Sequence, residues 1–252
     1  MTRTLLVRAL FAGTAMMMST AALAQDAEPQ PDPSDATADA AIAEVSAVDD
    51  LGPLGDVSGH RVDITDEDAV ADLADAVYDA HGRVALLFNN AGVTSGGGGK
   101  PWQQEPNDWR WCFGVNVFGM ATCTSTFVPR MIAGGGPGQI VNTSSGDGGF
   151  APVPLASVYA ASKAAVSCFT ESLHHNLVSE GTALRASVFY PSGGLLRTGL
   201  FTAARNRPEH LARRGDATGR RSMTFDEMKA MLARAGRDVT EADLDELGDF
   251  AV

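Results

Sequence analysis

The arrangement of apolar and polar positions becomes regular from about residue 60 onward. A short apolar alternation predicts a strand over Arg61–Ile64. Thr65, followed three residues later by Asp68, has the spacing of a helix start, and apolar residues then recur at helical intervals over Val70–Val77. Gly82 follows this pattern, and glycine often ends helices because it adopts a left-handed conformation without steric cost. This region therefore predicts a strand followed by a helix.

The same alternation continues along the next hundred residues. Val84–Phe88 is a continuous apolar run, as expected for a parallel strand that is buried on both faces. A long helix is predicted from Asn107 to about Met131, with Asn107 and Asp108 able to cap it. Further along, the pattern predicts the strand Gln139–Thr143, the helix Ser157–Ser179 and the strand Arg185–Tyr190. Strands that alternate with helices predict an α/β fold built on a doubly wound parallel sheet.

Composition and charge exclude several classes of function. The 252 residues are 44% hydrophobic and 20% charged, which suits one globular domain with a real core. A net charge of -12 without a basic stripe argues against nucleic acid and anionic membranes as partners. The cysteines Cys112, Cys123 and Cys168 form no CxxC pair, so we interpret them as buried small residues of a reducing compartment. No histidine pair has metal-ligand spacing, and we therefore expect no metal site.

Tyr159 and Lys163 are the strongest candidate for chemistry. Residues four apart on a helix lie on the same face, so an ammonium can lie beside a phenol. A nearby cation favours the phenolate, and a tyrosine with a lowered pKa can exchange a proton with an alcohol or a carbonyl. The alternative is a surface tyrosine beside a solvated lysine, because this pattern is short and common.

Three upstream motifs change this balance. Leu86–Gly92 is an apolar run that ends in Asn-Asn-Ala-Gly, Asn116 lies between two valines, and Ile140–Gly146 ends in hydroxyls and glycine. In this order, and followed by Tyr-x-x-x-Lys, the motifs resemble those of the short-chain dehydrogenase/reductase family. The resemblance covers roughly residues 60–200. It implies a Rossmann-like doubly wound parallel sheet in which the N-terminal βαβ part is missing or degenerate.

The resemblance also implies roles for four residues. Tyr159 would be the acid/base, and Lys163 would lower its pKa and hydrogen-bond the nicotinamide ribose. Ser145 would hold the substrate oxygen, and we choose it over Ser144 because the glycine-rich turn begins directly after it. Asn116 would interrupt its helix and bind a water that leads protons to Lys163.

The implied cofactor is NAD or NADP. The residue that selects between them follows the second strand of the family fold, which the sequence does not reveal, so the preference stays open. Asn89 could instead tie two strands together, and Asp63, which would meet the adenine edge, could instead cap a helix. The resemblance implies cofactor contacts at Asp63, Asn89, Ala91, Gly92, Tyr159, Lys163, Pro191 and Thr198.

The N-terminal part allows two interpretations. Residues 1–24 have a basic start, a short apolar stretch and Ala22-Leu23-Ala24, which is the layout of a secretory signal peptide. Alternatively, Leu5–Val7 followed by Ala9, Gly13 and Ala15 is a degenerate first strand and phosphate turn that keeps one of three glycines. Residues 25–58 are acidic and rich in Pro and Ala, as in a linker. Residues 59–252 would form the Rossmann-like domain, with 195–252 as a helical extension on the substrate side.

These observations leave two functional hypotheses from different classes. The first is an NAD(P)-dependent oxidoreductase that acts on a secondary alcohol or ketone, cytoplasmic by family resemblance and assembled as a homodimer or homotetramer. The second is a relative, exported if residues 1–24 act as a signal, that serves as a binding protein and no longer binds dinucleotide. A third possibility is that the N-terminal part is no natural match to the rest.

Overall fold

The structure, a computed structural model, describes residues 4–8, 15–18, 57–95, 99–150, 156–191, 200 and 203–214. Its main sheet has four parallel strands in the order β2-β4-β5-β6. These strands are β2 (Ala15–Met18), β4 (Leu86–Asn89), β5 (Gly138–Thr143) and β6 (Leu184–Phe189). Three of them coincide closely with predicted strands, which confirms the parallel α/β sheet.

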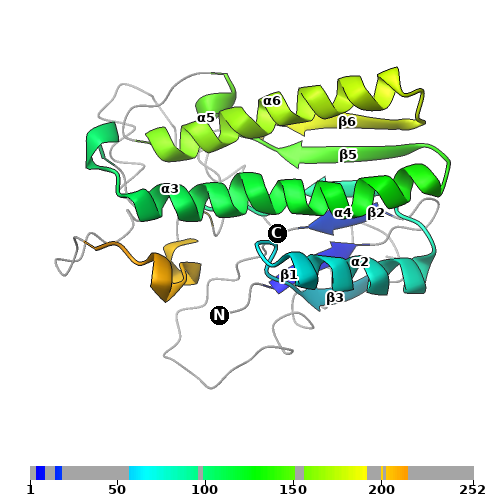
Figure 1. Ribbon diagram of the computed structural model, residues 1–252, viewed down its shortest axis with the longest axis horizontal. Helices are drawn as coiled ribbons and strands as arrows, with labels where there is room; N and C mark the ends of the chain where they lie inside the picture. Colours follow the sequence, from blue (N-terminus) through cyan, green and yellow to red (C-terminus); the bar gives the residue numbers. More distant parts are fainter. Residues whose placement is uncertain are drawn as a thin grey trace, which may run out of the picture.

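The long helices of the described region lie side by side on one face of the strands (Figure 1). The connections from β4 to β5 and from β5 to β6 run over this face as helices, as parallel strands require. The helical segments are α2 (Glu67–His81), η2 (Pro101–Gln103), α3 (Pro106–Phe113), η3 (Gly114–Gly119), α4 (Met120–Ala133), α5 (Gly146–Gly149), α6 (Ser157–Ser179), η4 (Ala203–Asn206) and η5 (Glu209–Leu211).

The hydrophobic core lies between the sheet and these helices. Leu87 of β4, Ile140 of β5 and Leu184 of β6 are almost completely buried, and Val77 of α2 and Phe127 of α4 pack in the same cluster. Burial of each such side chain contributes about 1.5–3 kcal/mol relative to leaving it in water. The core thus fixes the sheet, whose strand ends carry the predicted site residues.

The first predicted strand lies earlier than expected. It was placed at Arg61–Ile64, but β3 (Val57–Arg61) ends at the first of these residues. The chain turns there because Oδ1 of Asp63 accepts hydrogen bonds from the Thr65 amide at 3.0 Å and the Thr65 hydroxyl at 2.8 Å. Helix α2 is then capped by Asp66, one residue after Thr65, and it ends at Gly82 as predicted, with a φ of 73°.

The long helix begins at Pro106 rather than at the predicted cap Asn107–Asp108. Proline suits the first helical position because its missing N–H would have no intrahelical partner there. Asp108 lies three residues after the cap residue Glu105, and its carboxylate accepts a hydrogen bond from the Glu105 amide at 2.9 Å. The helix runs to Ala133, but η3 interrupts it with a π-helical segment that contains Asn116.

This helix is also long and apolar enough to cross a membrane. Over the described residues, Pro106–Ala133 alone meets the length and hydropathy that a membrane span requires. However, 56% of its most apolar window is buried inside the protein. It therefore has the properties of a core helix.

The N-terminal strands differ from the expected arrangement. β1 (Thr4–Arg8), which contains the predicted first strand Leu5–Val7, pairs antiparallel with β3 and lies outside the four-stranded sheet. β2 instead lies beside β4 in the parallel sheet. The predicted linker largely falls outside the described residues, although β3 includes its last two positions, and most of the predicted extension 195–252 also lies outside them.

Candidate active site

The predicted site residues follow strands that end at the same edge of the sheet. In the strand register, Asn89 pairs with Asn142, and Thr143 pairs with Phe189. Ligands of open α/β sheets bind outside this carboxyl edge. Ser145 lies just beyond β5 and Pro191 just beyond β6, so the fold brings together segments that are far apart in the sequence.

Ser145 and Tyr159 lie close together. The Ser145 hydroxyl caps the short helix α5 by accepting a hydrogen bond from the Asp147 amide at 3.2 Å, and it lies near enough to the Tyr159 phenol to act on its pKa. Burial raises the pKa of Tyr159 to about 12, and the Ser145 hydroxyl opposes this shift. The phenol is therefore neutral at physiological pH.

Lys163 lies beside Tyr159 but does not act on it as expected. Its Nζ is 5.7 Å from the centroid of the Tyr159 ring and donates a hydrogen bond to the Thr143 carbonyl at 2.9 Å. Only 3% of Lys163 is exposed, and this burial lowers its pKa to about 8. We expected Lys163 to lower the pKa of Tyr159, but in the protein alone the pKa of Tyr159 is raised.

Ser144 has a structural environment that differs from that of Ser145. Its buried hydroxyl donates to the Lys163 carbonyl at 2.9 Å and shares a 2.7 Å hydrogen bond with the Ser167 hydroxyl. The Tyr190 hydroxyl donates to the same Ser167 oxygen at 3.1 Å. Ser144 thus fastens the end of β5 to α6, whereas Ser145 lies near the Tyr159 phenol.

Asn116 lies in the π-helical segment and connects three elements. Its Oδ1 accepts from the Val93 amide at 2.8 Å, and its Nδ2 donates to the Val93 carbonyl at 2.9 Å and to the Ser162 hydroxyl at 2.9 Å. The Ser162 hydroxyl in turn donates to the Tyr159 carbonyl at 2.7 Å. The interruption of the helix at Asn116 agrees with the prediction, and the side chain holds the segment after β4 against α6.

A small cavity adjoins the predicted cofactor residues. Asn89, Ala91 and Ile64 line it together with Met120 and Cys123. Asn89 does tie strands together, because its Nδ2 donates to the Asn142 Oδ1 at 2.8 Å. Its own Oδ1, however, is buried and has no hydrogen-bond partner. A buried acceptor without a donor is costly, so this atom fits a ligand that carries an N–H or O–H group.

Gly92 keeps open the space between the cavity and Lys163. A Cβ at this position would lie 3.3 Å from the Lys163 Nζ and 3.6 Å from the Asn116 Oδ1. A side chain there would crowd both groups. The glycine therefore allows close approach of a ligand to the buried ammonium.

The remaining predicted cofactor contacts are less well defined. The Asp63 carboxylate forms the turn after β3 through its Oδ1, and it does not cap α2. Pro191 lies at the carboxyl edge, two residues beyond β6. Thr198 lies outside the described residues.

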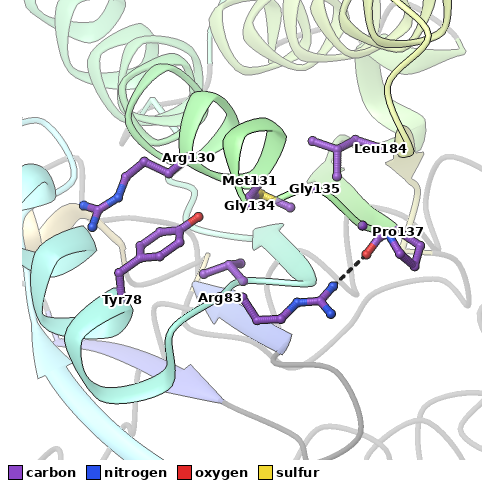
Figure 2. A pocket seen from close by; sticks show the side chains of 10 residues that line it. Tyr78, Arg83, Arg130, Met131, Gly134, Gly135, Pro137 and Leu184 are labelled. Carbon is purple, nitrogen blue, oxygen red and sulfur yellow. Dashed lines mark hydrogen bonds between the residues drawn. The ribbon is translucent and has the colours of Figure 1, made fainter.

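A second small cavity lies at the opposite edge of the sheet (Figure 2). Tyr78, Arg83 and Arg130 line it, and the Arg83 Nη2 donates to the Pro137 carbonyl at 3.0 Å. The guanidinium of Arg130 lies over the Tyr78 ring and pairs with Asp75, on the far side of the ring from Arg83. No predicted site residue contributes to this cavity.

Sequence reasoning missed several residues that support the site. Ser162 lies inside the Tyr-x-x-x-Lys motif, and Cys112 lies four residues before Asn116, so helical spacing was a signal for both. The buried Cys112 thiol accepts from the Asn116 Nδ2 at 3.4 Å. Cys112 and Cys123 are buried as predicted, but Cys168 is exposed on α6 because it faces away from the sheet. Within the described ranges, no group of three His, Cys, Asp or Glu side chains could hold a metal.

Comparison with known proteins identifies the family. The short chain dehydrogenase family model matches residues 13–208, which is most of the chain. The chain belongs to the short-chain dehydrogenase family. This membership and the structural neighbours below confirm the Rossmann-like fold, and the match begins within the segment that was also interpreted as a signal peptide.

Several members of the short-chain dehydrogenase family resemble the chain in sequence. A C alpha-dehydrogenase from Sphingobium sp. is 39% identical over 166 residues, which cover 64% of this chain and 52% of that protein. A 1-deoxy-11-beta-hydroxypentalenate dehydrogenase from Streptomyces avermitilis is 35% identical over 146 residues, covering 58% of this chain and 53% of the relative. The chain thus spans about half the length of the curated relatives it matches.

Solved structures of the short-chain dehydrogenase family also match. A member from Burkholderia phymatum, solved in complex with NAD, has a TM-score of 0.65 and 38% identity and covers 79% of this chain and 68% of its own. A metagenomic short-chain oxidoreductase in complex with NADP has a TM-score of 0.53 and 30% identity, with 63% of this chain and 69% of that chain covered.

Proposed function

We propose that the chain is an NAD(P)-dependent oxidoreductase that moves a hydride between a nicotinamide cofactor and a secondary alcohol or ketone, with Tyr159 as the acid/base. The observation that carries this proposal is the placement of the Ser145 hydroxyl near the Tyr159 phenol, with the buried Lys163 beside the tyrosine ring at the carboxyl edge of the sheet. Family membership supports the reaction class, because the similar relatives are named dehydrogenases.

The described residues fit a dinucleotide. Asn89, Ala91 and Gly92 would line it, with the unpartnered Asn89 Oδ1 as an acceptor for one of its donor groups. The cofactor would supply or accept the hydride. The similar structures contain NAD in one case and NADP in another, so the proposal covers both dinucleotides. Cofactor contacts of Lys163, Pro191, Thr198 and Asp63 are part of the same proposal.

The residues of the site would then divide the proton chemistry. The Ser145 hydroxyl would orient the substrate oxygen, and the Tyr159 phenol would donate its proton to a ketone oxygen or remove one from an alcohol. A neutral phenol is the form that donates, so the raised pKa of Tyr159 favours ketone reduction at neutral pH. The Lys163 ammonium would stabilise negative charge on the phenolate after proton transfer, and Asn116 would bind a water that leads protons to Lys163.

Replacement of Tyr159 tests the proposal. We expect Tyr159→Phe to lower turnover by about 10²–10⁴-fold, because the positioned proton is lost while the ring still packs. Turnover is measured from the absorbance of reduced nicotinamide, with isopropanol, cyclohexanol and benzhydrol as alcohols and the matching ketones in the other direction.

Tyr78→Phe is the matched control. Tyr78 lines the cavity at the opposite edge of the sheet, so its loss should leave turnover within about twofold of the wild type. Circular dichroism of both variants would establish that they fold. An unchanged rate in Tyr159→Phe would contradict the assigned role of the phenol.

A second candidate is a binding protein of the same family that no longer binds dinucleotide. It is favoured by the sequence after the first apolar stretch, which keeps one of the three expected glycines, and by the structure, in which Ala15 begins strand β2 rather than ending a phosphate turn. A phosphate turn without its glycines would not let a helix N-terminus approach a pyrophosphate. Dinucleotide binding by the purified chain distinguishes the two candidates.

We also propose that the protein self-associates through its two long helices. The exposed side chains along them include Phe118 and Ile132 on η3 and α4, which leaves apolar surface open to water. A dimer or tetramer would cover this surface, and light scattering would measure its mass.

The acidic net charge supports a small-molecule substrate rather than nucleic acid or an anionic membrane as partner. The intact mass of the expressed chain shows whether residues 1–24 are removed. Removal would support export, and their retention would support a cytoplasmic location.

A further inference from the structure

Four charged side chains form a cluster between the start of α3 and the segment 203–214. The Asp108 Oδ1 pairs with the Arg207 Nη1 at 2.8 Å, and the Asp108 Oδ2 pairs with the Arg213 Nη2 at 3.0 Å. Arg213 also lies 3.6 Å from Glu105. We name this cluster of Glu105, Asp108, Arg207 and Arg213 the Asp108 clamp. Two carboxylates face two guanidinium groups, so its charges balance.

The clamp is buried to an extent that is unusual for charged groups. The Asp108 side chain is 0% exposed and the Arg207 side chain 8% exposed. A buried ion pair often contributes little net stability compared with apolar side chains, but removal of one partner typically costs about 3–5 kcal/mol. The Arg207 Nη2 is even buried without a hydrogen-bond partner. We therefore infer that the clamp mainly fixes the positions of these side chains and adds less to the stability of the protein.

The clamp fixes one segment against two others. The Arg207 Nη1 donates to the Ser95 carbonyl at 3.2 Å, which ties segment 203–214 to the residues after β4. The Asn107 Nδ2 donates to the Ala212 carbonyl at 2.9 Å, and the Arg214 amide donates to the Glu105 Oε2 at 2.7 Å. In contrast, the segment contributes few apolar side chains to the core, Ala203 and Leu211 among them. Polar contacts thus determine where segment 203–214 lies.

The clamp is close to the proposed active site. The Arg207 guanidinium lies 5.2 Å from the centroid of the Trp111 ring, and the next residue, Cys112, contacts Asn116 and Ser162. The charges of Lys163, Asp108 and Arg207 all act on the pKa of the Cys112 thiol. Figure 1 shows segment 203–214 beside the start of α3, at the end of the molecule toward which the parallel strands point. This is the edge where ligands of such sheets bind.

We propose that the Asp108 clamp holds segment 203–214 as a wall of the substrate opening, and that Asp108 and Arg207 are positioning residues for substrate binding. This inference rests on the proposed function for its kinetic part. The clamp lies at the start of α3, whereas the Asn89 cavity is lined by Met120 and Cys123 of α4, so loosening of the wall affects the alcohol or ketone and leaves dinucleotide binding unchanged.

Hydrogen exchange tests the mechanical part without a substrate. The amides of Leu211 and Ala212 are bonded within the segment, and their exchange is followed by mass spectrometry of the peptide that covers 203–214. We expect Asp108→Asn and Arg207→Gln to exchange at least about tenfold faster than the wild type in this peptide. Arg207→Lys, which keeps the charge but loses the planar fork, should lie between them and the wild type. Exchange at the wild-type rate in all three would overturn the proposal.

Kinetics test the positioning part with the best substrate of the alcohol and ketone panel. Arg207→Gln and Asp108→Asn should raise KM for that substrate about tenfold and change kcat less than about twofold, with Arg207→Lys partly restoring KM. A fall in kcat at unchanged KM would overturn the proposal, because a wall acts on binding and not on proton transfer. Should Asp108→Asn fail to fold, Arg207→Lys decides the question alone.

The exposed pair Arg130–Asp75, at 2.6 Å on the α2 side of the molecule, supplies the control. Asp75→Asn removes one carboxylate from a surface ion pair and should change neither exchange in 203–214 nor KM. If the wild type bound neither NADH nor NADPH, the proposed function would fail. The exchange result would then still decide whether the clamp orders the segment, so the two failures are distinguishable.

Discussion

Lys163 is a buried cation whose ammonium bonds a backbone carbonyl rather than a carboxylate. The pKa of Lys163 is lowered to about 8 by burial, and that of Tyr159 is raised to about 12 for the same reason. Each shift records a free-energy cost of the charged form in the folded protein. For both Tyr159 and Lys163, burial therefore disfavours the charged form of the side chain.

The lysine makes the stability of the protein depend on pH. Below about pH 8, Lys163 is charged in both states and the folded protein bears the full cost of burial. Between that pKa and the ordinary value of 10.5, the unfolded chain binds more protons, so stability rises with pH. We expect the stability of the wild type relative to Lys163→Met to increase by up to about 3 kcal/mol over this range. Urea unfolding near neutral pH and again near pH 9.5 measures the difference, and equal values at both would contradict the cost of burial.

Sequence spacing could predict which side chains meet, but not their protonation. Tyr159 and Lys163 lie on one face of α6 as four-residue spacing requires, and Ser144 and Ser145, which glycine placement distinguished, have different surroundings. The direction of the Tyr159 pKa shift was wrong, because desolvation depends on how deeply the helix packs. Asp108 and Arg207 are 99 positions apart in the chain, so no local pattern could reveal that they pair.

At the scale of elements, α5 controls the distance between Ser145 and Tyr159. Gly148 has a φ of 91°, and a Cβ there would collide with the Ala160 carbonyl oxygen. The loop that carries Ser145 therefore lies directly against the first turn of α6. This contact determines how far the Ser145 hydroxyl lies from the Tyr159 phenol.

Substitution of Gly148 should separate these two groups. Gly148→Ala forces the loop away from α6, and a displacement of about 1 Å in a reacting geometry can lower the rate about 10²-fold. Gly146→Ala, in the same loop but with nothing within 4 Å of its Cβ, is the control and should retain the wild-type rate. Comparison of kcat for the two variants tests this, and a fully active Gly148→Ala would show that the loop is not held by this contact.

Element types followed from the hydrophobic pattern, whereas their ends depended on single polar contacts. Helix α6 begins and ends at the predicted residues. The strand predicted at Arg61–Ile64 was displaced because Asp63 and Thr65 form a turn, and the cap of α2 moved to Asp66 with it. β1 pairs with β3 and therefore lies outside the parallel sheet. This pairing joins residues far apart in the chain, so the apolar run Leu5–Val7 alone could not predict it.

On the scale of the whole molecule, dinucleotide binding is the property that separates the two proposed functions. A ligand that binds only the folded chain stabilises it by about 2.7 kcal/mol at a concentration of 100 times its Kd. For a chain of this size, we expect NADH or NADPH to raise the melting temperature by about 5–10 °C. Nicotinamide alone, in place of the dinucleotide and in the same buffer without AMP, serves as the control. No shift with either dinucleotide at millimolar concentration would favour the binding protein.

The distribution of thiols over the helices α3, α4 and α6 has a practical consequence. All three cysteines of the chain lie in the described region, and Cys168 alone is exposed, while Cys112 and Cys123 are buried and the pKa of each is raised. Alkylating reagents react with accessible thiolates, so a maleimide dye would label a single position. That position follows Lys163 by little more than one helical turn, on the outer side of the helix. The native chain therefore carries its own attachment point for a fluorescent reporter of events near the proposed catalytic residues.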